Sequence, residues 1–478
     1  MSSTDPTHCL ETSTRNRPGG VLRAAVAAAL LGAQAAPART GPEFDALRAQ
    51  LEALTEVVAQ QAQEIERLKQ GAASSPTPGA SPSSDGSVAD GDAQVIGPQG
   101  RPARQPLGRF PDDAIVTAGN FDGAIRIPGT GASVRLGGFI RAEGNYDLDN
   151  AGFQDSFNPR RIPLDGSVDD DTQQVRFHVR NTRVNLDVRN DTPLGEFRTF
   201  VEFDFFGGGN EFISNYEARI RHAAAQLGSL YVGQWWSQFV DIRSSPETVD
   251  FGGPFSQPAA RNPGVRWNQS AGEQWRFGVG IENPAGDLTG PEALLASDSV
   301  PNVTSFVETT RPWGRLRLSA LGLQLESTTD EIFTGGIQFS GRVYVPWLDP
   351  RDNIVFGAQA GEGFTHFYST LATVGLDGVV SEDGSVEATG ILGGFFAYQH
   401  WWSERWRSTF EVSALDLDLP QGADSSAYTG GERFSANLYW TPVDNANFGI
   451  EMIYGRNGVL SGENGSASRL AAVARFDF

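Results

Sequence analysis

The chain has very little cysteine and almost no lysine. Cys9 is the only cysteine among 478 residues, and Lys69 is the only lysine, so all but one of the 37 basic residues are arginine. Because Cys9 lies in a predicted leader, the mature chain offers no disulfide and no thiol nucleophile. Arginine presents a rigid forked donor to carboxylates and phosphates, although a GC-rich genome is the simpler explanation of the bias.

Long apolar runs are also missing. No stretch reaches the roughly 18 apolar residues that a transmembrane helix needs. The net charge of −21 argues against a nucleic-acid partner, because phosphate binding needs a basic face. Residues 21–36 (VLRAAVAAALLGAQAA) form a short Ala-rich run that follows several arginines and ends in a small-x-small cleavage pattern. We predict that residues 1–38 are a secretory signal peptide, which leaves the periplasm or the outer membrane as the destination.

Two segments separate the leader from the main domain. Residues 44–70 carry a heptad pattern that predicts a coiled-coil helix, with Gln61 as the single polar seam residue; the alternative is one amphipathic helix packed on the main domain. Residues 71–113 are dominated by Gly, Ala, Ser, Pro and Asp. Such a composition cannot bury enough apolar area to offset ordering, so we predict a disordered linker.

From residue 114 to residue 478, apolar and polar side chains alternate. In residues 134–148, for example, Leu136 and Ile140 fall on one face and Arg141 and Glu143 on the other. A period of two with one apolar and one polar face is typical of a strand between lipid and water.

Long and short connections also alternate along this region. Eight long loops interleaved with seven short turns predict an all-β transmembrane barrel of about 16 antiparallel strands, with the helix of residues 44–70 on its periplasmic side. The tryptophans fall near strand ends, as in the aromatic girdles of such barrels. A soluble β-sandwich is the alternative, but it would not explain the difference between loops and turns.

The third long loop, residues 237–262, is the predicted constriction. In general porins this loop folds into the barrel and narrows the channel. Its charged residues are Asp241, Arg243, Glu247, Asp250 and Arg261. The inward arginines expected to face it are Arg141, Arg183, Arg198, Arg219, Arg221 and Arg266. An acidic loop opposite an arginine wall would set a transverse field across the gap and favour anions. The alternative is that these arginines only neutralise inward carboxylates.

Three motifs in this region resemble those of the DcaP-like porins. They are NTRVNLDVR (residues 181–189), GEFRTFVEFDFFG (195–207) and SPETVDFGGP (245–254), within a matching block of about residues 137–267. The resemblance implies a trimeric 16-stranded outer-membrane channel for small anions, often dicarboxylates. It also implies a periplasmic N-terminal coil, which corresponds here to residues 44–70.

No pattern predicts an enzyme, a metal site or a cofactor. His178, His222, His366 and His400 are scattered without the spacing of zinc ligands. Residues 169–171 (DDD) fit a solvated loop better than a divalent-cation site. Neither a G-x-S-x-G elbow nor a P-loop lysine is present.

We therefore predict a porin in the outer membrane of a Gram-negative bacterium, in contact with lipid and lipopolysaccharide, through which small anionic solutes such as dicarboxylates diffuse passively. One alternative is a phosphate-selective porin, although such channels also use luminal lysines. Another is an envelope tether whose coil binds peptidoglycan. An outer-membrane enzyme is a third, but the sequence offers no convincing nucleophile–His pair.

Overall fold

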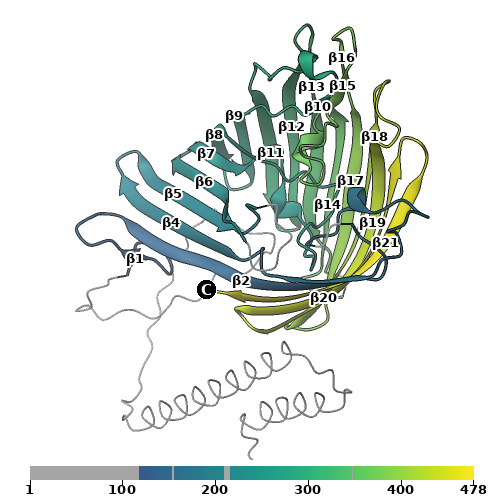
Figure 1. Ribbon diagram of the computed structural model, residues 1–478. Helices are drawn as coiled ribbons and strands as arrows, with labels where there is room; N and C mark the ends of the chain where they lie inside the picture. The colour runs from purple at the N-terminus through teal and green to yellow at the C-terminus, as the bar shows by residue number, and fades with distance from the viewer. Residues whose placement is uncertain (1–117, 153–154, 209–215, 347) are drawn as a thin grey trace, which may run out of the picture. The chain divides into compact units, whose positions relative to one another are not determined.

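The described part of the chain forms a closed β-barrel. The structure is a computed structural model that describes residues 118–152, 155–208, 216–346 and 348–478. Consecutive wall strands pair antiparallel, and β2 pairs with β21 to close the sheet (Figure 1). The predicted signal peptide, coiled coil and linker (1–38, 44–70 and 71–113) lie outside the described residues.

The described wall has 16 strands, which confirms the predicted fold class. The sheet contains 18 strand segments, but β1 (Ile125–Arg126) only flanks β2, and β3 and β4 are two halves of one interrupted strand that both pair with β2. The wall segments are β2 (Ser133–Asp147), β3 (Gln174–His178), β4 (Arg183–Thr192), β5 (Gly195–Asp204), β6 (Arg219–Leu227), β7 (Leu230–Trp236), β8 (Arg261–Ala271), β9 (Trp275–Glu282), β11 (Asn302–Arg311), β12 (Gly314–Glu326), β13 (Glu331–Tyr344), β14 (Asn353–Glu362), β17 (Gly390–Trp401), β18 (Trp406–Asp418), β19 (Tyr428–Val443), β20 (Ala446–Val459) and β21 (Asn464–Asp477).

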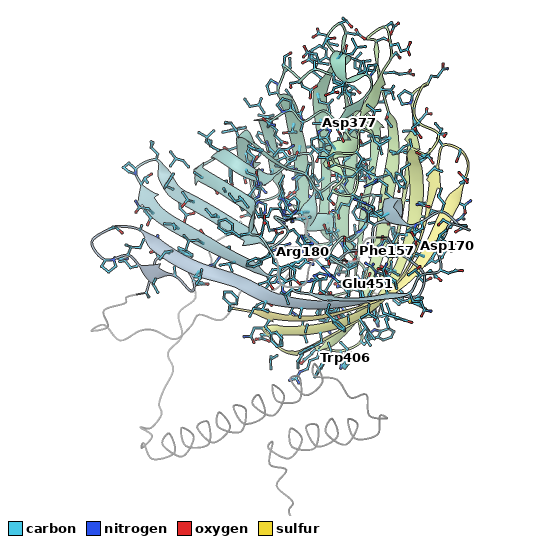
Figure 2. The ribbon with its side chains drawn as sticks, viewed as in Figure 1. Phe157, Asp170, Arg180, Asp377, Trp406 and Glu451 are labelled. Carbon is cyan, nitrogen blue, oxygen red and sulfur yellow. The ribbon has the colours of Figure 1, made fainter. Side chains whose placement is uncertain are left out.

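The two faces of the wall differ as the alternation predicts. In β2, Leu136 and Ile140 are exposed on the outer face, while Arg141 and Glu143 are buried inside. Rings gather near the short turns, where Trp406 and Trp440 stack with their centroids 5.8 Å apart (Figure 2). Among the helices that the structure describes, none has the length and apolarity to cross a membrane.

Eight loops lie at one end of the barrel and seven turns at the other, and most of the loops are longer than the turns, although L5 and L8 are shorter than the turn between β13 and β14. We name the loops L1 (148–173), L2 (205–218), L3 (237–260), L4 (283–301), L5 (327–330), L6 (363–389), L7 (419–427) and L8 (460–463). They contain η1 (Pro159–Arg161) in L1, η2 (Ile242–Ser244) in L3, β10 (Leu288–Thr289) and η3 (Glu292–Leu294) in L4, and η4 (Thr365–Phe367), β15 (Gly378–Val380) and β16 (Val386–Ala388) in L6. The short segments β10, β15 and β16 form a small separate sheet that joins L4 to L6.

An apolar cluster inside the barrel, which we call the inner core, occupies the side of β12 to β19. L3 contributes Phe239 and L6 contributes Phe364 and Phe367; the three rings pack edge to face at centroid distances of 5.4 to 6.5 Å. They rest on the inward leucines of β12, which are Leu321, Leu323 and Leu325. A smaller cluster joins L1 to β19, β20 and β21. Among the described residues of β4 to β9, only the half-buried Trp236 of β7 packs against either cluster, and we call this less covered part of the inner wall the uncovered wall.

Candidate functional site

L3 is fixed to the barrel wall by its own carboxylates. Asp241 accepts hydrogen bonds from Arg315 Nη2 (2.9 and 2.8 Å), from Ser340 Oγ (2.6 Å) and from Ser244 Oγ (2.7 Å). Burial opposes ionisation of this side chain, but the neighbouring guanidinium groups of Arg315 and Arg317 outweigh it and hold the pKa of Asp241 well below its ordinary value. Asp241 therefore stays charged and ties the start of L3 to β12 and β13.

The other two carboxylates of L3 continue this attachment. Glu247 forms a bidentate pair with Arg407 of β18 and accepts from Gln399 Nε2 of β17 at 2.8 Å. Asp250 accepts from the Phe157 backbone N–H of L1 at 2.7 Å, and its carboxylate lies 3.7 Å from Arg433 of β19. L3 is thus bonded to a series of strands on the C-terminal half of the wall.

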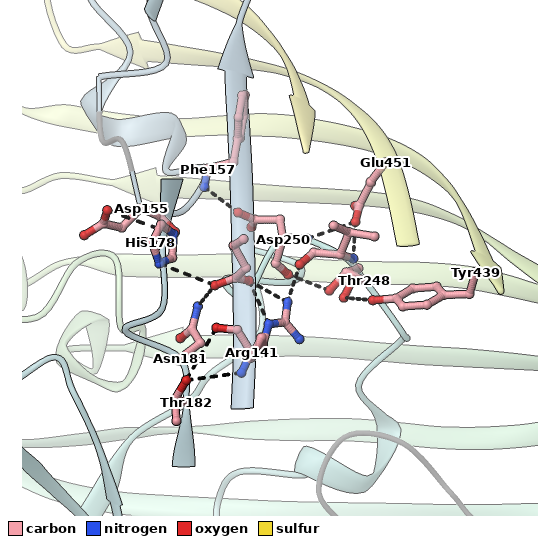
Figure 3. Close-up of polar contacts among 12 residues, drawn as sticks. Arg141, Asp155, Phe157, His178, Asn181, Thr182, Thr248, Asp250, Tyr439 and Glu451 are labelled. Carbon is pink, nitrogen blue, oxygen red and sulfur yellow. Dashed lines mark hydrogen bonds and ion pairs between the residues drawn. The ribbon is translucent and has the colours of Figure 1, made fainter. Parts of the chain in front are cut away.

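Backbone groups of L3 take part as well. Glu451 of β20 accepts from the backbone N–H groups of Val249 and Asp250, the latter at 3.0 Å (Figure 3). From β2, which β21 separates from β20, Arg141 donates to the Val249 carbonyl oxygen and to Glu143. Bonds from both strands leave this stretch of L3 little freedom to move.

L1 joins the same network through the break in the second wall strand. Asp155 accepts from Arg180 Nη1 at 2.5 Å and from Arg176 Nε at 3.0 Å, and its carbonyl oxygen lies 3.1 Å from His178 Nε2. Burial alone would raise the pKa of Asp155, but His178 and the two arginines lower it below its ordinary value. Residues at and beside the interruption between β3 and β4 therefore hold L1 against the inner wall.

The predicted loop residues lie along L3 but do not all face the predicted arginines. The three acids are bonded to Arg315, Arg407 and Arg433, all on the C-terminal half of the wall. Arg243 donates to Glu308 of β11 at 2.8 Å. Arg261 is the first residue of β8, and its guanidinium lies over the Trp236 ring with Cζ 5.0 Å from the centroid.

Four of the six predicted wall arginines lie next to L3 or next to Trp236, the residue just before it. Arg183 and Arg221 each approach the Phe251 ring, at 5.5 and 5.8 Å. Arg266 donates to the Trp236 carbonyl oxygen at 2.7 Å, and Arg141 bonds L3 as described above.

The other two predicted wall arginines are bonded elsewhere. Arg198 forms a bidentate pair with Asp187, at 2.9 and 2.8 Å, and Arg219 forms another with Asp204, at 2.9 and 2.7 Å.

An arginine cluster remains on the uncovered wall. Arg183, Arg221, Arg261 and Arg266 all lie within electrostatic range of the His222 ring, which packs on Trp235 at a centroid distance of 4.2 Å. The carboxylates of this region are Glu202, Asp204 and Glu282; the first two bond to Arg221, at 2.8 and 2.9 Å, and the third acts on Arg266. Because Asp204 also bonds Arg219, the cluster carries more positive than negative charge.

Several residues of this interior were not singled out from the sequence. Arg315, Arg407 and Arg433 hold L3, and Arg276 and Arg317 face the lumen from β9 and β12. Arg315 and Arg317 lie two residues apart on a segment with clear alternation, so their inward position was available from the pattern. Their bonds to a loop 71 or more residues away were not.

The comparisons with known proteins fit this geometry. Residues 117–308 match the family described as DcaP outer membrane protein. The crystal structure of the outer membrane channel DcaP of Acinetobacter baumannii superposes with a TM-score of 0.63 at 23% sequence identity, covering 73% of this chain and 98% of that chain. Over residues 117–308 the chain is similar to the DcaP outer membrane proteins, and its barrel has the same fold as the DcaP channel. An anion-selective porin from Comamonas acidovorans resembles it more distantly, with a TM-score of 0.50 and 9% identity over 73% of this chain and 100% of that one. No curated protein sequence matches it.

The DcaP-like barrel has the fold of an outer-membrane channel, and its interior offers binding groups rather than reactive ones. Among the described residues, no three His, Asp or Glu side chains are grouped to hold a metal ion. Its uncovered wall instead presents guanidinium groups beside aromatic rings. Such groups can bind a passing anion through charge-assisted hydrogen bonds.

Proposed function

We propose that the DcaP-like barrel lets small anionic solutes diffuse passively across the outer membrane, with L3 narrowing the route. The observation that carries this proposal is the arginine cluster on the wall beside L3. Arg183, Arg221, Arg261 and Arg266 outnumber the carboxylates there, and the acids of L3 are turned away and neutralised by other arginines. The net field at the narrowed region then favours anions.

Within this class we propose dicarboxylates as the main solutes. A guanidinium fork matches a carboxylate with two parallel hydrogen bonds, and several forks on one wall can engage both ends of a dicarboxylate. The resemblance to the DcaP-like porins supports the same solute class. It also supports a homotrimer surrounded by lipid and lipopolysaccharide, with the helix of residues 44–70 in the periplasm.

The direct test is ion selectivity in planar lipid bilayers. Under a KCl gradient, we expect a reversal potential that reports a preference for chloride over potassium, and we expect this preference to fall in the Arg183→Gln/Arg221→Gln double variant. Arg351→Gln is the matched control, because Arg351 lies on a short turn and is bonded to Asp349. A cation preference of the unaltered protein would contradict the proposal.

The solute class is tested by competition. Succinate added to the chamber should reduce the chloride current at lower concentration than phosphate does, because its two carboxylates can reach guanidinium groups that lie farther apart than the oxygens of one phosphate can span. Stronger block by phosphate would favour a phosphate-selective porin instead.

A further inference from the structure

Three arginines of β8 and β9 share an arrangement that sets them apart from the other luminal arginines. Arg261, Arg266 and Arg276 each lie over an aromatic ring, with Cζ 5.0 Å from Trp236, 5.0 Å from Tyr231 and 5.7 Å from Phe306, respectively. Among the described residues, no carboxylate comes within 4.0 Å of any of them. We call these three residues the stacked arginines.

Stacking leaves the hydrogen-bond donors of these arginines available. A ring holds a guanidinium through its flat face, whereas a carboxylate occupies the N–H groups at its edge. Arg266 uses Nη1 for the Trp236 carbonyl oxygen, and the guanidinium groups of Arg261 and Arg276 make no hydrogen bond within the described residues. Arg315 differs, because both of its Nη atoms donate to the carboxylates of Glu308 and Asp241.

The stacked arginines follow the wall from L3 toward the turns. Arg261 pairs with Trp236 directly beside L3, Arg266 pairs with Gly280, and Arg276 pairs with Ser270 next to the β8–β9 turn. At about 3.3 Å per residue, the step from residue 261 to residue 270 covers roughly 30 Å of strand. The charges of Arg266, Arg276 and Arg317 are close enough to repel one another, so an anion between them would be stabilised.

The wall is also open beside Arg266. Neighbouring strands carry glycine there, at Gly233, Gly264 and Gly280. A small hollow beside Arg266 is lined by Tyr231, Trp235, Asn262 and Glu282 and by the exposed side chains of Val232, Val265 and Ile281. Glu282 is already bonded, to the Gln238 backbone N–H at 2.9 Å, to Thr304 Oγ1 at 3.0 Å and to Asn262 Nδ2 at 3.2 Å. These bonds tie its carboxylate to L3, β8 and β11, and its charge also attracts the Arg266 guanidinium.

We propose that anions cross the barrel along β8 and β9, passing from Arg261 to Arg266 to Arg276, and not through the middle of the lumen. The inner core and the anchored L3 fill the side of β12 to β19, which leaves this wall as the charged path. The inference rests on the proposed function and deepens it by assigning the residues that set the route.

The test compares charge-neutral variants in planar bilayers. Arg266→Gln and Arg276→Gln should each lower the anion-to-cation permeability ratio about fivefold, since removing one nearby charge changes the attraction by an amount of that order. The triple variant with Arg261→Gln should lower the ratio further. Arg189→Gln is the matched control, because it removes one inward charge from β4 at a guanidinium that bonds Asp187 at 3.1 Å. It should leave the ratio unchanged.

The outcomes separate this inference from the proposed function. If the unaltered protein prefers anions but the variants at Arg266 and Arg276 keep its ratio, the route is wrong and the proposed function stands. If Arg189→Gln lowers the ratio as much as they do, total luminal charge sets selectivity and the route is again wrong. If the unaltered protein does not prefer anions, the proposed function itself fails. Unheated gel migration, which reports a folded barrel, should be the same for all variants.

Discussion

At the residue scale, the carboxylates of L3 act as anchors. Each one meets a wall arginine in a buried pair, and the best defined is Asp241 with Arg315, where both side chains are at most 6% exposed. A buried ion pair does not by itself guarantee a gain in stability. Removing one partner, however, leaves the other charge buried without a partner, which is destabilising. The position of L3 should therefore be sensitive to each of these carboxylates.

We predict that Asp241→Asn destabilises the barrel by about 3 kcal/mol and increases current fluctuation, because Arg315 loses one of its two carboxylate partners inside the barrel. Denaturant unfolding in detergent micelles measures the first effect, and single-channel recording measures the second. Asp349→Asn should change neither, because the pair of Asp349 with Arg351 lies on a short turn in solvent. An equal loss in both variants would contradict the anchoring role.

The same variant should reveal the pH range of the anchor. The pKa of Asp241 is lowered in the folded barrel from an ordinary value of 3.8, so its contribution is complete above about pH 4 and is lost as the pH falls through the lowered value. The difference in stability between the unaltered protein and Asp241→Asn should then be constant from pH 7 to pH 5 and should narrow below pH 4.

At the element scale, the strands and loops follow from the sequence, but the filling of the lumen does not. Alternation predicted the closed 16-stranded wall and placed L3 between β7 and β8. On β12, however, Leu321 and Leu323 point inward while Leu318 and Ala320 point outward, so both faces are apolar and the period of two carries no signal. The inner core is built from that stretch and from L6. The sequence of L6 has no alternation of apolar and polar residues.

The charged groups of the site show the same limit. Composition identified the acids of L3, and alternation identified inward arginines on several strands. Which acid bonds to which arginine depends on the path of L3 through the barrel. The local sequence pattern does not predict that path. Glu247 and Arg407, for example, are 160 residues apart. The break between β3 and β4 also escapes local pattern, because Arg180 bonds there to L1 and L2, 25 and 28 residues away.

We predict that Phe367→Ala destabilises the barrel by about 3 to 5 kcal/mol, because this fully buried ring packs on Phe239 and Phe364 and would leave a cavity in the inner core. L6 should also become easier to cleave. Denaturant unfolding and limited proteolysis measure the two effects. Val168→Ala in L1 is the control, since Val168 is 99% exposed and should show neither change. Unchanged proteolysis of L6 in Phe367→Ala would contradict a packing role for this ring.

At the scale of the whole molecule, charge is divided along the barrel axis. L4 to L8 contain no arginine or lysine, while they carry acidic residues such as Asp298, Glu382, Asp383, Asp424 and Glu463. Most arginines of the barrel lie on the strands, and those of the loops lie in L1 (Arg160 and Arg161) and in L3 (Arg243). An anion that approaches the loop end first meets a negative rim and only then the positive wall.

We predict that Mg²⁺ added at the loop end raises anion current at low ionic strength, because it screens and neutralises the acidic rim. Current–voltage curves with Mg²⁺ on one side at a time measure the effect, which should be smaller from the turn end. At about 1 M KCl, where the screening length is about 3 Å, the effect should vanish. Equal effects from the two ends would contradict an axial division of charge.

The seam that closes the barrel also has a kinetic consequence. Asp147 of β2 and Arg469 of β21 meet there in a fully buried pair, with Nη2 and Oδ2 2.9 Å apart, although 322 residues separate them. Contacts of such long sequence separation form slowly, because the whole intervening chain must be ordered first. Until then both strands are open edges that can pair with another chain. The protein is therefore most prone to pair with other chains before β2 and β21 meet. A factor that assists its folding should cover the edges of these two strands.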